Sequence, residues 1–279
     1  MRIGWMLYAG LLLVGLTACA TAKPTPQTVT TDGGTWELVW ADEFDDSGLP
    51  DPEKWSYETG FVRNDELQYY TAKRTENARV ENGTLIIEAR KDGHAVPGAT
   101  RGYTSASLHT KATATWTYGR IEVRAKLPQG VGTWPAIWML GANIDAVGWP
   151  KCGEIDIMEH VGFEPGRIYG TVHTQAYNHM KGTARSGHLS LPDPFADFHV
   201  YAIEWFEDHI DFFVDDRKYF TFKNENAGVD AWPYDAPHYL ILNLAIGGAW
   251  GGQKGVDDSI FPQPYVIDYV RVFELVEGN

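Results

Sequence analysis

Residues 153–160 read GEIDIMEH and place three carboxylates within six positions of a segment that is otherwise typical of a buried strand. Side chains alternate between the two faces of a strand, so Glu154 and Asp156 share one face, whereas Glu159 would point to the opposite face. The apolar residues between the acids need burial on that opposite face. Strict alternation therefore cannot serve both the acids and a core.

A β-bulge near Ile157 or Met158 removes this conflict, because one extra residue returns Glu159 to the face of Glu154 and Asp156. The Cα atoms of the outer two acids would then lie about 13 Å apart. Glu side chains that lean inward on a concave strand can bring the carboxyls to roughly 5 to 5.5 Å, the separation used by retaining glycosidases. The spacing predicts a catalytic strand; the alternative is a solvated strand face that happens to be acidic.

Short segments of alternating or apolar β-forming residues recur along the rest of the chain, and Gly, Pro, Asn or Asp separates most of them. A hairpin is expected over residues 206–222, with Asp215 and Asp216 at its turn. Together these patterns predict an all-β fold, a jelly-roll sandwich of two antiparallel sheets with a concave substrate cleft. The expected strands cover residues 36–40, 84–89, 119–127, 136–140, 168–173, 200–205, 210–214, 219–222, 239–246 and 265–273.

The first 19 residues differ in composition from everything that follows. A basic start precedes an apolar run over residues 3–16, which is too short to span a membrane and resembles a secretory signal peptide. Residues 16–19, LTAC, resemble a bacterial lipobox, in which Cys19 becomes the lipidated first residue. The alternative is a plain signal peptide cut close to the same position.

Residues 20–33 are rich in Thr and Pro and are expected to form a flexible tether, followed by one catalytic domain over residues 34–276. We therefore expect an exported cell-envelope lipoprotein, at the outer membrane or cell surface, that meets the membrane through a lipid on Cys19. Without lipidation the protein would be secreted. The domain is expected to be a monomer.

The formal net charge of −14 makes nucleic acid an unfavourable partner. A neutral polysaccharide would not be repelled by such a surface. Cys152 is the only cysteine expected in the folded domain, so no intramolecular disulfide can form there. We expect this thiol to be a buried structural residue rather than a nucleophile.

Tryptophan is abundant, with 11 residues, and several lie beside Gly or Pro. Trp250 stands between glycines in GGAWGG, where it lacks apolar neighbours in sequence, and is expected to be exposed and to bind substrate. Trp134 and Trp138 lie four positions apart on a strand-like run and share a face. That face can be either a sugar-stacking cleft or the core.

The hexapeptide EIDIME at 154–159 resembles the E-x-D-x-x-E signature of glycoside hydrolase family 16 in its bulged form. This form is shared by bacterial endo-1,3-β-glucanases (laminarinases), agarases and carrageenases. Other stretches resemble the laminarinase branch in particular and occur in the order of that family. They are WADEF at 40–44, NDELQYYT at 64–71, GTWPAIWML at 132–140 and DYVRV at 268–272.

The resemblance implies that Glu154 is the nucleophile and Glu159 the general acid/base of a retaining mechanism that needs no cofactor. Glu159 would protonate the departing oxygen while Glu154 attacks the anomeric carbon, and Glu159 would then activate water. Asp156 can hydrogen-bond Glu154 and tune its pKa. The alternative for Asp156 is a merely structural carboxylate.

The resemblance also implies a set of substrate-binding residues around the acids. His173, in TVHTQ, resembles a family histidine near the acid/base, with a core or surface histidine as the alternative. Arg101 is a candidate for the cleft, with a solvated loop position as the alternative. The implied set, joined by Trp250, is Asn64, Glu66, Arg101, Trp134, Trp138 and His173.

Many members of the family carry a structural Ca²⁺ on the convex side, away from catalysis. Glu43, the carbonyl of Gly83, and Asp268 occupy the matching positions, and oxygen ligands suit this hard cation. No linear calcium motif such as an EF-hand loop is present. The alternative is that Glu43 and Asp268 are ordinary surface acids.

The leading hypothesis is a retaining endo-hydrolase of 1,3-β-glucan, of the laminarin type. The same mechanism on agarose or mixed-linkage β-glucan is an alternative, whereas the acidic chain argues against sulfated carrageenan. A non-catalytic β-glucan-binding protein is the alternative from another class. The presence of all three acids argues against that alternative.

Overall fold

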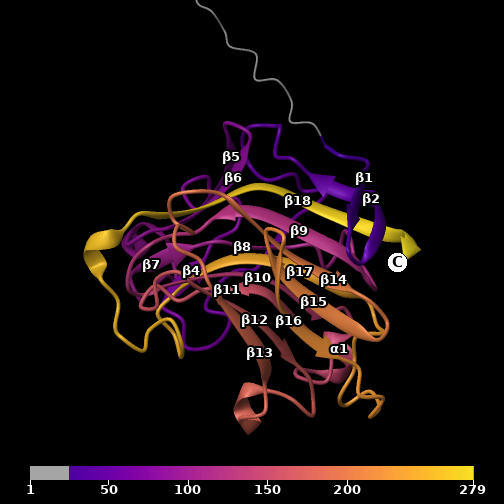
Figure 1. The fold of residues 1–279 in the computed structure, drawn as a ribbon. Coiled ribbons are helices and arrows are strands. Elements are labelled where there is room, and N and C mark those ends of the chain that lie inside the picture. The colour runs from indigo at the N-terminus through magenta and orange to yellow at the C-terminus, as the bar shows by residue number, and fades with distance from the viewer. Residues whose placement is uncertain (1–24, 279) are drawn as a thin grey trace, which may run out of the picture.

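The computed structural model describes residues 25–278 as a sandwich of two antiparallel sheets (Figure 1). The first sheet has the order β1 (Thr28–Thr31), β2 (Gly34–Asp42), β18 (Gln263–Gly278), β9 (Gly119–Lys126), β14 (His199–Trp205), β15 (His209–Val214), β16 (Arg217–Lys223), with β5 (Ala78–Glu81) and β6 (Thr84–Ala89) joined through β18. The second sheet has the order β13 (Arg185–Ser190), β12 (Arg167–His173), β11 (Glu154–Glu159), β10 (Thr133–Gly141), β17 (His238–Ile246), β8 (Ser107–His109), β3 (Ser56–Tyr57).

Little other regular structure is present in the described part of the chain. Two short strands pair in parallel beside the sheets, and one helical turn lies between β10 and β11. The remaining elements are β4 (Gln68–Tyr70), β7 (Tyr103–Ser105), α1 (Ile144–Val147), η1 (Gly93–Ala95), η2 (His179–Lys181) and η3 (Asp258–Ile260). The all-β sandwich predicted from the strand pattern is confirmed.

All ten expected strands are present, and the expected hairpin is formed by β15 and β16 around Asp215 and Asp216. The strands that the sequence pattern missed are short or polar. β13, RSGHLS, is the longest of them, and its exposed side chains alternate with half-buried ones at an open sheet edge. Pairing with β12, rather than its own composition, holds it in the sheet.

The core lies between the two sheets and contains one side of nearly every long strand. β17 is buried along its whole length, because side chains pack on both of its faces. Aromatic residues supply much of the buried volume. Burial of each large apolar side chain stabilises the folded state by about 1.5–3 kcal/mol. The largest fully buried side chains include Trp36, Trp55, Trp205, Tyr201, Phe212 and Phe273.

Two glycines allow β12 and β13 to approach the first sheet closely. Gly170 and Gly187 face each other across the strand pair. A Cβ atom at Gly170 would lie 2.5 Å from the hydroxyl oxygen of Tyr219, and one at Gly187 would lie 2.5 Å from Cβ of Phe220. This contact fixes the outer side of the second sheet.

Replacement of Gly187 by Val is expected to lower the free energy of unfolding by about 1–3 kcal/mol, because the added carbons overpack the contact with Phe220. Chemical denaturation measures the change. Ser186→Val is the matched control, since Ser186 is exposed on the opposite face of the same strand and should change stability by less than about 0.5 kcal/mol. Equal losses for both variants would contradict the packing argument.

The boundary of the domain differs from the sequence expectation. Thr28–Thr31 form β1 and pair with β2, so the last part of the segment 20–33 belongs to the first sheet rather than to a flexible tether. Residues 1–24, with the predicted signal peptide and Cys19, lie outside the described residues, and their predicted roles stay predictions. No helix in the described range has the length and apolar character needed to cross a membrane.

Candidate active site

The predicted bulge is present in β11. The register between β11 and β12 shifts between Asp156 and Glu159. The consecutive residues Ile157 and Met158 are both fully buried in the core between the sheets, which strict alternation would not allow. The extra residue returns Glu159 to the face that carries Glu154 and Asp156.

Each outer carboxylate accepts a hydrogen bond from a tryptophan indole. Trp149 Nε1 donates to Glu154 Oε2 at 2.8 Å, and Trp134 Nε1 donates to Glu159 Oε1 at 3.0 Å. Trp149 lies in the loop between β10 and β11, and the sequence pattern gave no signal for it. Glu154, Asp156 and Glu159, the predicted catalytic residues, form one row, which we call the catalytic row. The two indoles mark its two ends, and Asp156 is buried between them.

A buried polar network extends from β10 toward β4. Trp138 Nε1 donates to Asn243 Oδ1 at 2.7 Å, and the Asn243 amide donates to the Tyr70 hydroxyl at 3.0 Å. The Tyr70 hydroxyl and the Gln68 amide both donate to Glu66 Oε2, at 3.2 and 2.6 Å. Trp138 is therefore largely buried and fixed, and Glu66 is the acidic centre of the network.

The loop before β4 brings two more predicted residues to this network. Asn64 is exposed, has a φ of 54°, and donates its amide to Glu66 Oε1 at 3.3 Å. Arg101 donates to the backbone oxygen of Glu66 at 2.5 Å and lies over the ring of Phe61. Arg101 thus supports the loop from its exposed side.

Arg63 also lies in the candidate site, and the sequence pattern did not indicate it. Its guanidinium lies over the ring of Trp138, with Cζ 4.9 Å from the ring centroid, and pairs with Glu58. Its positive charge also favours the ionised form of Glu154. Its position directly before Asn64 in sequence was the available signal.

His173 lies beside Glu154 and not beside Glu159, the predicted acid/base, which corrects the expected position of this histidine. It stands opposite Glu154 in the register between β11 and β12. Its Nε2 lies 3.4 Å from Asp156 Oδ2 and 3.7 Å from Glu154 Oε1. Burial lowers the pKa of His173 to about 4, with a smaller contribution from His179, so the imidazole is neutral at neutral pH.

Trp250 is more enclosed than its flanking glycines suggested. It is half-buried, and its ring contacts Trp134 edge-on at 5.7 Å and Tyr169 edge-on at 5.1 Å between centroids. The expectation of an exposed side chain was wrong because the loop after β17 folds back over the sheet. Trp134, Trp250 and Tyr169 form a continuous aromatic wall at the Glu159 end of the row.

Comparison with known proteins shows the family to which the chain belongs. The sequence profile of Glycosyl hydrolases family 16 matches residues 65–271. The chain belongs to this family. It is 57% identical over 251 residues to a beta-glucanase of Rhodothermus marinus, a match that covers 87% of this chain and 86% of the relative.

Solved structures agree with this family 16 assignment. The X-ray structure of the laminarinase from Rhodothermus marinus has a TM-score of 0.83 and 56% identity, covering 87% of this chain and 98% of that chain. The crystal structure of a non-specific endo-β-1,3(4)-glucanase of the same family has a TM-score of 0.83 and 46% identity, covering 90% and 100%. That glucanase holds 1,3-β-D-cellobiosyl-glucose at its active site. The predicted family and the glycoside hydrolase class are confirmed.

Burial disfavours the charged form of all three acids of this family 16 enzyme. Burial raises the pKa of Glu154 to about 7, against the opposing effects of the Trp149 indole and the Arg63 charge. Burial raises the pKa of Glu159 to about 8, and the charge of Glu154 adds to this effect while the Trp134 indole opposes it. The additional charge effect on Glu159 favours Glu154 as the ionised member of the pair.

The protonated form of Asp156 is favoured as well. Burial, followed by the charges of Glu154 and Glu159, raises the pKa of Asp156 well above its usual range. A protonated Asp156 can donate a hydrogen bond to Glu154, which stabilises the ionised form of Glu154. This division is consistent with the predicted roles, in which Glu154 is ionised and Asp156 and Glu159 are protonated.

The two indoles are expected to move opposite limbs of the pH profile of kcat/KM, which rises as Glu154 ionises and falls as Glu159 ionises. Trp149→Phe removes a donor that stabilises ionised Glu154, so its pKa rises and the acidic limb moves up by about one pH unit. Trp134→Phe raises the pKa of Glu159 by the same reasoning and moves the alkaline limb up. A shift of the same limb in both variants would contradict the assignment.

The predicted calcium ligands already have cationic partners. Arg271 donates to both oxygens of Glu43, at 2.8 and 3.0 Å, and Arg124 donates to Asp268 at 2.6 Å. A dication at these carboxylates would have to displace the two guanidinium groups. Calcium binding by Glu43, Gly83 and Asp268 stays a prediction.

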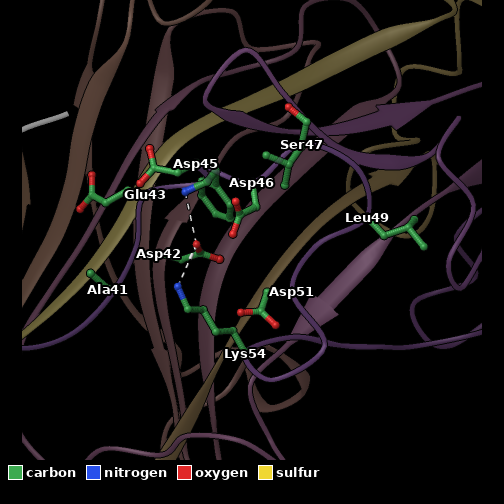
Figure 2. Close-up of a pocket in the computed structure, with 11 residues that line it drawn as sticks. Ala41, Asp42, Glu43, Asp45, Asp46, Ser47, Leu49, Asp51 and Lys54 are labelled. Carbon is green, nitrogen blue, oxygen red and sulfur yellow. Dashed lines mark hydrogen bonds and ion pairs between the residues drawn. The ribbon is translucent and has the colours of Figure 1, made fainter. Parts of the chain in front are cut away.

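Glu43 also lines an acidic hollow of about 360 Å³ in the loop after β2 (Figure 2). Asp42 is held inside it by Lys54 at 3.1 Å, by the Phe44 amide at 3.2 Å and by Trp55 at 2.7 Å. None of the predicted catalytic or substrate-binding residues lines this hollow. Within residues 25–278, the one group of three His, Cys, Asp or Glu ligand atoms within 4.8 Å of one another is Glu154, Asp156 and His173, which coincides with the catalytic row.

Proposed function

We propose that this family 16 enzyme hydrolyses internal 1,3-β-glucosidic bonds of laminarin-like glucan with retention of configuration. The observation that carries the proposal is the single face of β11 that holds Glu154, Asp156 and Glu159, with a tryptophan indole donating to each of the two outer carboxylates. The high identity to the beta-glucanase and laminarinase of Rhodothermus marinus supports the choice of polymer.

The chemistry follows from the different protonation of the two glutamates. Ionised Glu154 attacks the anomeric carbon, and Glu159 donates its proton to the departing oxygen. The bond from the anomeric carbon to that oxygen breaks as an ester to Glu154 forms. Glu159, now ionised, takes a proton from water as the water attacks the ester and frees Glu154.

The polar network on the β10 side supplies recognition of the donor sugar. Asn64 presents its side chain at the surface above Glu66, where both can bind hydroxyl groups. Trp134 is half-buried and offers a ring face for stacking, whereas Trp138 is mainly fixed in the network. Removal of Glu66 would leave the donors of Gln68 and Tyr70 without their acceptor.

Incubation of the purified domain with laminarin tests the proposal. We expect new reducing ends from internal cleavage, with β-anomers appearing first by NMR. Mixed-linkage β-glucan is a second candidate substrate, because one close structural relative is a non-specific endo-β-1,3(4)-glucanase. Agarose and carrageenan complete the panel, and cleavage of agarose without cleavage of laminarin would overturn the proposed substrate.

A catalytically silent variant separates an enzyme from a glucan-binding protein. Glu154→Ser should bind laminarin as tightly as the wild type in affinity electrophoresis and release no reducing ends. Equal behaviour of the variant and the wild type in both assays would favour a binding protein.

We also propose that the enzyme is a monomer exported to the cell envelope and anchored by a lipid on Cys19. Cys19→Ala should move the protein from the detergent phase to the aqueous phase in Triton X-114 partitioning of expressing cells. Thermal unfolding with and without a chelator tests the predicted structural Ca²⁺, and an unchanged Tm would remove that prediction. Catalysis itself requires no cofactor in this proposal.

A further inference from the structure

The cleft face of β12 lies directly beside the catalytic row. Residues 169, 171 and 173 alternate onto one face of the strand, and each stands opposite one acid of β11. The pairs are Glu159 with Tyr169, Asp156 with Thr171, and Glu154 with His173. The opposite face of β12 packs on the first sheet through Gly170, and this packing fixes the position of the strand.

The two sides of β11 differ in chemistry. On the β10 side lie the buried hydrogen-bonding groups around Glu66 and Asn243, which suit recognition of the donor sugar. The scissile bond lies above β11, between Glu154 and Glu159. A polymer that reaches β11 from the β10 side must therefore continue over β12, and neighbouring strands are about 4.8 Å apart.

Tyr169 is held as a ring platform at this place. Its half-buried ring contacts Trp250 at 5.1 Å and the exposed His188 of β13 at 6.0 Å between centroids. The Arg167 guanidinium lies over the Tyr169 ring, with Cζ 5.7 Å from the ring centroid, and the Tyr169 hydroxyl donates to Glu164. The ring is braced on several sides before any substrate arrives.

A second wall faces Tyr169 across Thr171. His179, on the exposed turn η2, lies 5.2 Å from the ring of His173 and 5.1 Å from the ring of Trp149. Thr171 is largely buried and forms the floor between the two walls. Aromatic and imidazole rings therefore stand on both sides of Thr171 along the strand.

We propose that the glucosyl unit on the leaving-group side of the scissile bond binds above Thr171, against the ring of Tyr169, with His179 on its other side. This inference rests on the proposed function and adds to it the residues that bind the leaving sugar. The subsite also binds the acceptor when a sugar rather than water resolves the ester on Glu154. Tyr169 is thus a positioning residue for polymer cleavage and for transfer.

Two substrates with the same donor part and different leaving groups test the proposal. Laminarin places a sugar on the leaving-group side, whereas β-laminaribiosyl fluoride loses a single atom and occupies only the donor side. Tyr169→Ala should lower kcat/KM for laminarin about tenfold, in the range of a lost aromatic contact, and leave fluoride release within about twofold of wild type. The ratio of transfer products to hydrolysis products should fall as well.

Tyr169→Phe is the matched control, because it keeps the ring and removes only the hydrogen bond to Glu164. It should retain kcat/KM for laminarin within about twofold. Equal losses on both substrates in Tyr169→Ala, or a loss in Tyr169→Phe as large as that in Tyr169→Ala, would overturn the proposal. If the wild type releases fluoride but leaves laminarin intact, the proposed polymer is wrong, an outcome that the wild type alone reveals.

Discussion

Replacement of Glu154 by Ser is expected to lower kcat on laminarin by roughly five orders of magnitude, because no other group can form the ester with the anomeric carbon. Asp156 lies beside Glu154, but its protonated form is favoured, so it is a poor nucleophile. His173 is neutral and buried, with 7% of its surface exposed. Reducing-end assays on the purified variant measure the loss. The fold should persist, since Glu154 is half-buried and its removal relieves crowding among three acids.

Asp156→Asn is the comparison variant for Glu154→Ser, because it changes the adjacent acid of the row. Asn keeps the shape and can still donate a hydrogen bond to Glu154, so its loss should be far smaller than that of Glu154→Ser. A Glu154→Ser enzyme with activity within tenfold of the wild type would contradict the nucleophile assignment. A loss in Asp156→Asn equal to that in Glu154→Ser would move the assignment toward Asp156.

Replacement of Glu159 by Ala is expected to lower kcat/KM on laminarin by about 10²–10⁴, the usual contribution of a general acid. Fluoride needs no proton to depart, so the first step on β-laminaribiosyl fluoride should keep its rate. The second step lacks its base and becomes slow. A burst of fluoride equal to the enzyme concentration should therefore precede slow turnover.

Added azide sharpens this test, because a small anion can attack the ester without a base. We expect azide to speed turnover of Glu159→Ala and to give a β-glycosyl azide, since attack occurs on the face that Glu159 occupied. Wild type should show no such rescue. Loss of the burst, or an α-azide product, would contradict the role of Glu159.

Much of the fold could be predicted from the sequence, because period-two patterns of apolar residues directly describe one-sided burial. The bulge in β11 was predictable for the same reason: three acids that need one face cannot be reconciled with Ile157 and Met158 unless both apolar residues face the core. β13 was not predictable, because its polar side chains carry no burial signal and only pairing with β12 orders it.

The candidate site was predictable where function rests on strand residues and less so where loops return to the cleft. Trp149 reaches Glu154 from the loop after α1, and no local pattern indicates such a contact. The contacts of Arg63 with the Trp138 ring and of Tyr169 with Trp250 likewise arise from tertiary structure. The glycines beside Trp250 in sequence suggest an exposed side chain, whereas its neighbours in space, Trp134 and Tyr169, come from β10 and β12.

Trapping of the covalent intermediate tests the central claim most directly. A laminaribiosyl fluoride with fluorine at carbon 2 of the reacting sugar forms the ester but releases it slowly, so the adduct can be located by mass spectrometry of proteolytic peptides. The account predicts one adduct per chain, on Glu154. An adduct on Glu159 or Asp156, or none under conditions in which the enzyme cleaves laminarin, would contradict it.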